Sequence, residues 1–143
     1  MYQVIIADDD LSFLNEAVTQ TISIMEHNGL RQGIDYEVIT FTQAQSLVKH
    51  FQQNINSCKL LMLDIELGTS NGLELMQELR DQNAQCSLIY LTNYQDYVYD
   101  CFDTKPLYYM VKPINWEKLA DVIMKDYRAY SHSDKLNLKL FGK

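Results

Sequence analysis

The sequence lacks any apolar run that approaches the roughly 20 residues of a membrane-spanning helix, and its first residues form no basic leader. Basic residues are also scarce, because 12 Lys and Arg stand against 19 Asp and Glu and leave a net charge of -7. Such a chain repels the phosphates of nucleic acids, which bind clustered Lys and Arg. We therefore expect a soluble, cytoplasmic protein that contacts neither membranes nor, through these 143 residues, DNA.

Cysteine and histidine patterns typical of metal sites are absent as well. The cysteines number three and lack CxxC spacing: Cys58, Cys86 and Cys101. The histidines show no ligand or triad spacing: His27, His50 and His132. An odd number of separated cysteines argues against a disulfide framework or a zinc site, and it favours reduced thiols in the core.

Short apolar runs alternate with segments of helical periodicity in a chain that is 47% hydrophobic. The predicted strands cover residues 4–7, 36–41, 60–63, 88–91 and 108–111. Apolar residues three and four apart predict five helices, over about 14–25, 44–51, 72–79, 95–102 and 116–127. Strands that alternate with helices imply right-handed crossovers and a parallel sheet covered on both faces. We therefore predict one doubly wound α/β domain over residues 1–130.

Polar residues follow four of the five predicted strands. They are Asp8, Asp9 and Asp10 after the first strand, Asp64 after the third, Thr92 at the end of the fourth and Lys112 after the fifth. In a doubly wound sheet, ligands bind beyond the carboxyl ends of the strands. Singly these residues have ordinary explanations, since Asp10 and Thr92 could each cap the following helix. Their joint placement predicts one polar site.

Carboxylates that meet at one edge of a sheet repel each other unless a cation lies between them. Carboxylate oxygens without a nearby His or Cys ligand suit Mg²⁺. Asp64 is then the natural nucleophile, because a carboxylate can form an acyl phosphate while the metal neutralises charge. Lys112 can pair with one phosphate oxygen, and the Thr92 hydroxyl can donate to another. These residues predict phosphoryl transfer to Asp64 beside Mg²⁺.

Two other functions fit parts of this pattern. A Mg²⁺-dependent phosphohydrolase with an aspartyl nucleophile would use an acid two residues further on, where Glu66 lies, but the chain has no long insertion to form a substrate cap. A flavin binder needs a phosphate-binding loop rich in Gly, Ser and Thr after the first strand. The acids at 8–10 would repel phosphate there, so the flavin alternative is disfavoured.

The motifs resemble those of response-regulator receiver domains from residue 4 to about 130. The matching segments are 5–10 (IIADDD), 61–66 (LMLDIE), 71–75 (NGLEL), 90–93 (YLTN) and 109–114 (YMVKPI). The resemblance implies a flavodoxin-like fold with strand order 2-1-3-4-5 and five helices. It also implies a phosphoacceptor switch, not an enzyme, that receives its phosphoryl group from a sensor histidine kinase and has at most weak self-phosphorylation and self-dephosphorylation.

The same resemblance assigns roles to individual residues. It implies that Mg²⁺ is bound by Asp8, Asp9, Asp64 and the backbone carbonyl of Glu66, and that Asp64 is the phosphoacceptor. Thr92 and Lys112 are expected to contact the phosphoryl group, Tyr109 to change rotamer as Thr92 moves, and the Lys112–Pro113 bond to be cis. Two departures are Gly68, where many receivers have proline, and Asn93, where a small residue is usual. They predict a more mobile loop before residue 72 and restricted access to the site.

The aromatic residues around the fourth helix and fifth strand are dense enough to predict a partner surface. They are Tyr94, Tyr97, Tyr99, Phe102 and Tyr108. We expect phosphorylation to drive homodimerisation through the fourth helix, fifth strand and fifth helix.

After residue 130 the periodicity becomes that of a strand, with Leu136, Leu138 and Leu140 alternating with polar residues. Residues 131–143 are predicted to be a linker, either disordered or the opening of a further domain. The segments 64–67 (DIEL) and 92–97 (TNYQDY), with this tail, resemble LytTR-type (LytR/AgrA-like) transcriptional regulators. That likeness implies a DNA-binding effector domain outside this chain.

Overall fold

The computed structural model describes the backbone of residues 1–141 and the side chains of residues 1–136. Five strands form a parallel sheet in the order β2-β1-β3-β6-β7: β1 (Tyr2–Ala7), β2 (Tyr36–Phe41), β3 (Leu60–Leu63), β6 (Ser87–Thr92) and β7 (Tyr108–Val111). Two short strands, β4 (Glu66–Leu67) and β5 (Ser70–Asn71), form a separate antiparallel hairpin. With that hairpin set aside, the strand order is the predicted 2-1-3-4-5.

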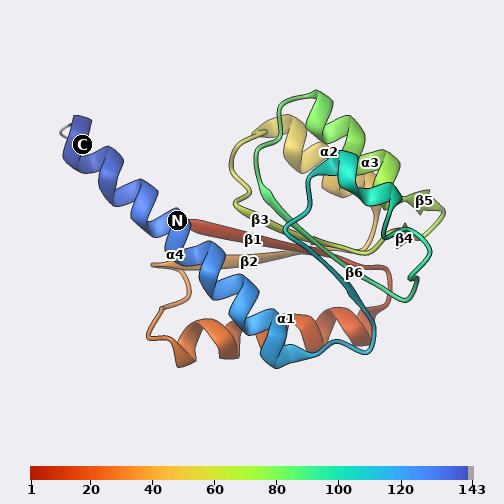
Figure 1. Ribbon diagram of the computed structural model, residues 1–143, viewed down its shortest axis with the longest axis horizontal. Helices are drawn as coiled ribbons and strands as arrows, with labels where there is room; N and C mark the ends of the chain where they lie inside the picture. The colour runs from red at the N-terminus through yellow and green to blue at the C-terminus, as the bar shows by residue number, and fades with distance from the viewer. Residues whose placement is uncertain (142–143) are drawn as a thin grey trace.

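Helices cover both faces of the sheet (Figure 1). On one face lie α1 (Leu11–His27) and α4 (Trp116–Phe141), and on the other lie α2 (Ala44–Gln53), α3 (Gly72–Asp81) and the 3-10 helix η1 (Asp100–Thr104). Alternate residues of β1 enter two hydrophobic clusters, since Val4 and Ile6 pack toward α1 and α4 while Ile5 and Ala7 pack toward α2 and α3. Strands buried on both faces explain the unbroken apolar runs of the sequence.

Two helices begin at capping residues that directly adjoin the predicted site. The Asp10 side chain accepts hydrogen bonds from the backbone N–H groups of Ser12 and Phe13, at 3.0 and 3.2 Å. The Asn71 side chain does the same at the start of α3, with the N–H of Leu73 at 2.8 Å. Such caps satisfy donors that the first helical turn leaves free. The N-cap explanation of Asp10 is confirmed.

The prediction of a fourth α-helix over 95–102 is wrong, so the described residues hold four α-helices and one 3-10 helix. Residues 96–99 form turns, and η1 covers only Asp100–Thr104. Within η1 the buried residues are Cys101 and Thr104, three positions apart, which is the repeat of a 3-10 helix. The Thr104 hydroxyl also lies 2.7 Å from the Tyr90 hydroxyl, which fixes the short helix on the sheet.

The strand expected around residues 136–140 is also wrong. Helix α4 continues to Phe141, and its last turns project beyond the sheet (Figure 1). Extending an existing helix adds one hydrogen bond for each residue fixed, whereas a strand needs a neighbour to pair with. The side chains of Leu138 and Leu140 lie outside the described residues. No helix of residues 1–141 is both long and apolar enough to cross a membrane.

Candidate functional site

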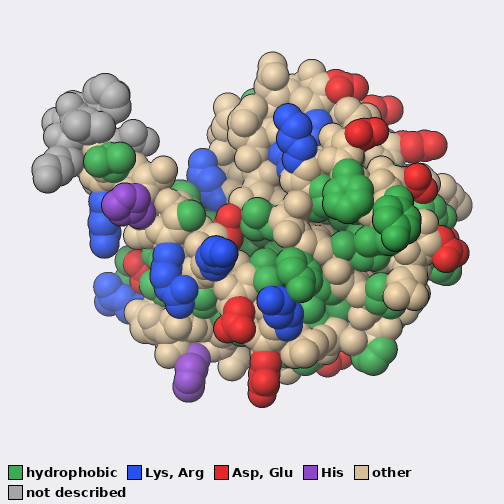
Figure 2. All heavy atoms as spheres, in the orientation of Figure 1, with side chains coloured by type: hydrophobic (Ala, Val, Ile, Leu, Met, Phe, Trp, Pro, Cys, Tyr) green, Lys and Arg blue, Asp and Glu red, His purple; other side chains and the backbone are tan. Residues whose placement is uncertain are grey.

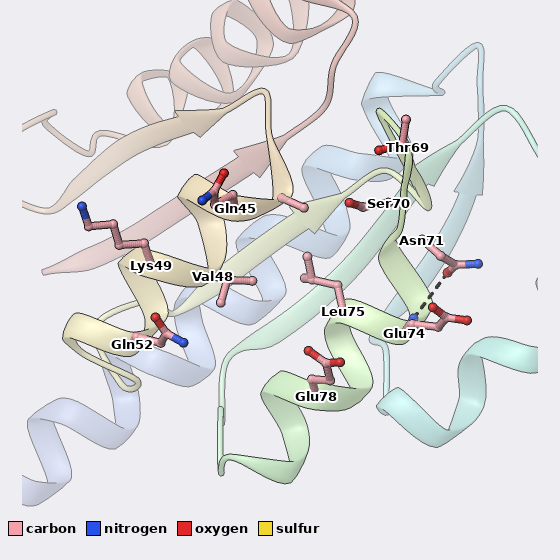
Figure 3. A pocket seen from close by; sticks show the side chains of 11 residues that line it. Gln45, Val48, Lys49, Gln52, Thr69, Ser70, Asn71, Glu74, Leu75 and Glu78 are labelled. Carbon is pink, nitrogen blue, oxygen red and sulfur yellow. Dashed lines mark hydrogen bonds between the residues drawn. The ribbon is translucent and has the colours of Figure 1, made fainter.

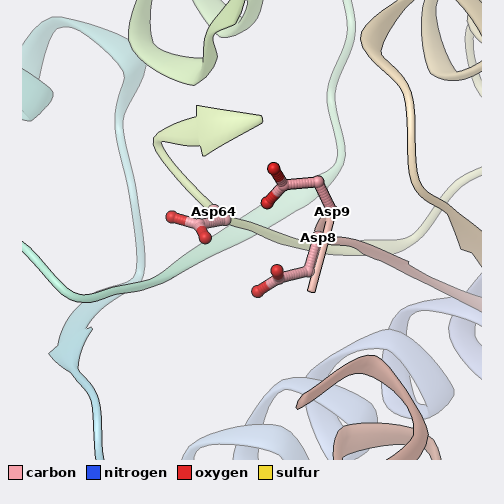
Figure 4. Close-up of side chains that lie close together, drawn as sticks. All are labelled: Asp8, Asp9 and Asp64. Carbon is pink, nitrogen blue, oxygen red and sulfur yellow. The ribbon is translucent and has the colours of Figure 1, made fainter. Parts of the chain in front are cut away.

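Three carboxylates meet where β1 and β3 end. The last paired residues of these adjacent strands are Ala7 and Leu63, so Asp8 and Asp64 follow side by side. One oxygen each of Asp8, Asp9 and Asp64 lies within 4.8 Å of the others. Figure 4 shows the three side chains around one small region. Asp8 and Asp64 are buried, with 1% and 5% exposure, and Asp9 opens the cluster to solvent.

Lys112 brings a positive charge to this cluster from the end of β7. Its Nζ lies 2.6 Å from Asp8 Oδ2 and 3.3 Å from Asp64 Oδ2. The same Nζ sits 3.9 Å from the centre of the Phe13 ring, a cation–π contact. The Lys112 backbone N–H donates to the Thr92 carbonyl at 2.7 Å, and the Lys112–Pro113 bond is cis as expected. No sequence pattern predicts that Phe13 contacts the site.

The electrostatic balance of the cluster is incomplete. Burial raises the pKa of Asp8, while the hydrogen bond from Lys112 opposes that shift. One ammonium group faces three carboxylates, so their mutual repulsion is only partly offset. The donor set is all oxygen, and two of its members are buried, which fits a hard divalent cation such as Mg²⁺.

Gly72 lets α3 begin against the backbone of the site. A Cβ at this position would lie 2.6 Å from the Asp64 carbonyl oxygen and 3.0 Å from Ile65 Cα. Any side chain would therefore push α3 away from the loop that carries Asp64. The sequence marked Gly72 only as part of a motif, because such an approach between backbones leaves no periodic signal.

The segment after β6 connects the site to Tyr109. Thr92 is fully buried, and its hydroxyl oxygen accepts from the Tyr94 N–H at 3.4 Å. The Tyr109 hydroxyl donates to the Tyr94 carbonyl, and burial raises the pKa of Tyr109 to about 12. The Tyr94 hydroxyl interacts with the Glu66 carboxylate, which raises the pKa of Tyr94. Thr92, Tyr109 and Glu66 thus all hold Tyr94.

The backbone of Glu66 adjoins the site, since its N–H donates to Asp64 Oδ1 at 3.3 Å. The metal role of its carbonyl stays a prediction. Gly68 lies in the two-residue turn of the β4–β5 hairpin with a φ of 63°. Proline is fixed near a φ of about -65°, so it could not occupy this turn. The departure at residue 68 therefore reflects a different turn.

Hydrophobic side chains gather on the face of the molecule that Figure 2 shows. Four of the five predicted interface residues are exposed: Tyr94 at 39%, Tyr99 at 83%, Phe102 at 63% and Tyr108 at 39%. The fifth, Tyr97, is half-buried and packs against the core cluster under α2 and α3. Leu107 and Val111 add exposed apolar surface that the sequence did not single out.

A separate hollow of about 810 Å³ lies between α2 and α3, and Figure 3 shows the side chains that line it. Its lining is largely polar, with Gln45, Lys49, Glu74 and Glu78 among the residues. It contains none of the three acids of the cluster, so it is distinct from the predicted site.

Comparison with known proteins identifies the class. The model of the response regulator receiver domain matches residues 4–124, so the chain belongs to this family. Among curated proteins it is similar to the sensory transduction protein LytT of Bacillus subtilis, with 24% identity over 87% of this chain and 48% of the relative. It is also similar to an uncharacterised response regulatory protein of Vibrio cholerae, with 28% identity over 64% of this chain and 39% of the relative.

Solved structures share the fold. A receiver domain from Methanospirillum hungatei has a TM-score of 0.73 and 21% identity, covering 93% of this chain and 98% of that one. The response regulator TrrA of Thermotoga maritima, solved in complex with Mg²⁺ and BeF, has a TM-score of 0.68 and 25% identity over 88% of this chain and 99% of that one. The chain spans less than half the length of the curated relatives described above.

Proposed function

We propose that Asp64 accepts a phosphoryl group from the phosphohistidine of a sensor kinase and that the modified domain controls an effector. The observation that carries this proposal is the meeting of Asp64 with Asp8, Asp9 and Lys112 at one sheet edge. An Asp64 oxygen attacks phosphorus, the new O–P bond forms as the N–P bond of the donor breaks, and the electron pair leaves with the imidazole nitrogen.

Asp8, Asp9, Asp64 and the Glu66 carbonyl would hold Mg²⁺, which when bound neutralises charge on the transferring group. The TrrA structure, named as a complex with Mg²⁺ and BeF, supports this assignment. Lys112 already bridges Asp8 and Asp64, so it needs only a small movement to pair with a phosphate oxygen.

The response would pass from Thr92 to Tyr109 through the Tyr94 backbone, which both side chains contact. If Thr92 turns toward the phosphoryl group, its hydroxyl loses the hydrogen bond from the Tyr94 N–H. The Tyr94 backbone can then move, and the hydrogen bond from the Tyr109 hydroxyl to the Tyr94 carbonyl changes with it. The exposed aromatic surface of η1 and β7 would then form the homodimer contact. The sensory transduction protein LytT, of which this chain covers 48%, supports an effector outside these residues. The likeness to LytTR-type regulators makes transcription the process that the effector would control.

The test is intact-mass analysis after incubation with Mg²⁺ and acetyl phosphate. Wild-type protein should gain one phosphoryl group, and Asp64→Asn should gain none. Asp121→Asn, an exposed acid on α4, is the matched control and should behave like wild type. Phosphorylation of Asp64→Asn would rule the proposal out. So would the absence of phosphorylation in wild-type protein incubated with Mg²⁺ and either acetyl phosphate or phosphoramidate.

Dimerisation is tested by sedimentation with and without the phosphodonor. Tyr99→Ser and Phe102→Ser remove exposed aromatic rings and should abolish any phosphorylation-dependent increase in mass while leaving phosphorylation of Asp64 intact. An unchanged increase in these variants would place the contact elsewhere.

A further inference from the structure

Two of the three cysteines lie together at the amino edge of the sheet, opposite the acidic cluster. Cys58 precedes β3 and Cys86 precedes β6, and these strands are neighbours. Both side chains are buried, at 2% and 5% exposure, in the same hydrophobic cluster. Both residues also belong to the lining of a surface cavity of about 560 Å³ beside α4.

The strand pairing brings the two backbones to a separation that suits a disulfide. Leu60 pairs with Ser87, and the Ser87 N–H donates to the Lys59 carbonyl at 2.8 Å, so Cys86 lies opposite Lys59 and diagonal to Cys58. Both cysteines precede the regular strands, and both side chains enter the same hydrophobic cluster instead of alternating between the faces of the sheet. Neighbouring strands about 4.8 Å apart and a rise of about 3.3 Å place such Cα atoms roughly 6 Å apart. Disulfides join Cα atoms at about 4.4–6.8 Å.

The chemical environment makes the two sulfurs unequal. A hydrogen bond between the thiols, with help from the nearby Arg80 guanidinium, lowers the pKa of Cys86, whereas burial raises the pKa of Cys58. Arg80 is held in place by bonds to the carbonyls of Ala84 and Cys86, both at 2.8 Å. The thiolate is the reactive form, so Cys86 is the attacking sulfur. Among the described residues no third metal ligand joins the pair, which disfavours a metal site.

We propose that Cys58 and Cys86 form a reversible, peroxide-sensitive dithiol that closes to a disulfide and ties β3 to β6 at the amino edge. The Cys86 sulfur attacks a hydroperoxide oxygen, the O–O bond breaks, and Cys86 becomes a sulfenic acid as one water or alcohol leaves. The Cys58 sulfur then attacks that sulfenic sulfur, the S–S bond forms as the S–O bond breaks, and the hydroxide leaves as water with the Cys58 proton. In a reducing compartment, disulfides of this kind are transient and serve redox sensing.

The experiment exposes the native protein to hydrogen peroxide, blocks free thiols after denaturation, and maps each cysteine by peptide mass. Cys58 and Cys86 should disappear together into one disulfide-linked peptide pair that dithiothreitol restores. Cys101, buried at 1% and with a pKa raised by burial, is the internal control and should stay free. Oxidation of Cys101 at the same rate, oxygen added to Cys86 with Cys58 still free, or no change in any cysteine would overturn the proposal.

Single variants test the order of attack. Cys58→Ser should stop the reaction at a Cys86 sulfenic acid that dimedone traps, and Cys86→Ser should slow oxidation of the remaining Cys58 at least tenfold. Equal dimedone labelling of the two variants would overturn the assigned roles. The peptide map of the wild-type protein needs neither variant. The proposal therefore stays testable even if one variant does not fold.

Discussion

Carboxylates at the two edges of the sheet have opposite surroundings. At the amino edge, Asp126 of α4 accepts from the Tyr2 hydroxyl at 2.5 Å and from the Ser87 hydroxyl at 2.6 Å, so each of its oxygens has a neutral donor. At the carboxyl edge, Asp8, Asp9 and Asp64 share one ammonium group from Lys112. The acid with two donors joins helix to sheet, whereas the three clustered acids carry negative charge that Lys112 offsets only in part.

The largest expected difference between variants at the two edges is in Mg²⁺ affinity. Replacing Asp8 and Asp9 together by Asn removes two of the three clustered carboxylates, and we expect Mg²⁺ affinity to fall by at least about tenfold, the lower range seen when support of a metal site is lost. Asp126→Asn should leave the affinity unchanged. Isothermal titration with Mg²⁺ measures both, and equal affinities in the double variant and wild type would break the comparison.

Gly72→Ala should have the next largest effect, on stability and on the site together. The added methyl would overlap the Asp64 carbonyl, and overpacking of this kind costs about 1–3 kcal/mol of unfolding free energy. Urea unfolding measures the loss, and Mg²⁺ titration should show weaker binding because the Asp64 loop is displaced. Gly33→Ala, where a Cβ meets nothing within 4 Å but φ is 83°, is a control for backbone strain without a clash. Weakened Mg²⁺ binding in that control would contradict the explanation.

Removing one charge from each edge should shift stability in opposite directions. Asp126→Asn leaves a hydroxyl without its charged acceptor and should cost about 1–3 kcal/mol. Asp9→Asn removes a repelling charge from an exposed position and should raise stability, by up to about 1 kcal/mol, when no divalent cation is present. Urea unfolding in a chelating buffer compares the two. A loss of stability in Asp9→Asn would mean that Lys112 already balances the cluster.

Most of the site was visible in the sequence because strand ends carry it. Asp8, Asp64, Thr92 and Lys112 follow apolar runs, and parallel pairing brings them to one edge whatever the details of the loops. Contacts through space left no such signal, as with Phe13 under the Lys112 ammonium and Gly72 against Asp64. The three cysteines are free and buried, as the sequence predicted, but the closeness of Cys58 to Cys86 left no signal for the same reason.

The prediction of secondary structure was wrong in two segments where tertiary contacts determine the structure. The spacing of apolar residues over 95–102 suggested a helix with a buried face. Tyr99 and Phe102 are exposed, however, so this spacing does not mark a buried face. Alternating leucines after residue 135 suggested a strand, yet α4 was already formed and continued.

Alkaline pH should weaken the amino edge through Tyr2. Burial, followed by the charge of Asp126, raises the pKa of Tyr2 above its ordinary value of 10.0. Below that value both the folded and unfolded chains keep the proton, and the stabilising contact is fully present. Above it the unfolded chain releases the proton first, so stability should fall by about 1.4 kcal/mol per pH unit for this group.

Tyr2→Phe is the variant that isolates this dependence. It loses a hydrogen bond at neutral pH, about 1 kcal/mol, but it has no proton to release, so its unfolding free energy should fall less steeply above pH 10 than that of wild type. Tyr109→Phe serves as the comparison at the other edge, where a pKa raised only to about 12 on a partly exposed ring predicts a smaller change in slope. Urea unfolding at several pH values gives the slopes. A larger decrease of this slope in Tyr109→Phe than in Tyr2→Phe would contradict the comparison, because Tyr2 at the amino edge would then not be the more strongly stabilised hydroxyl.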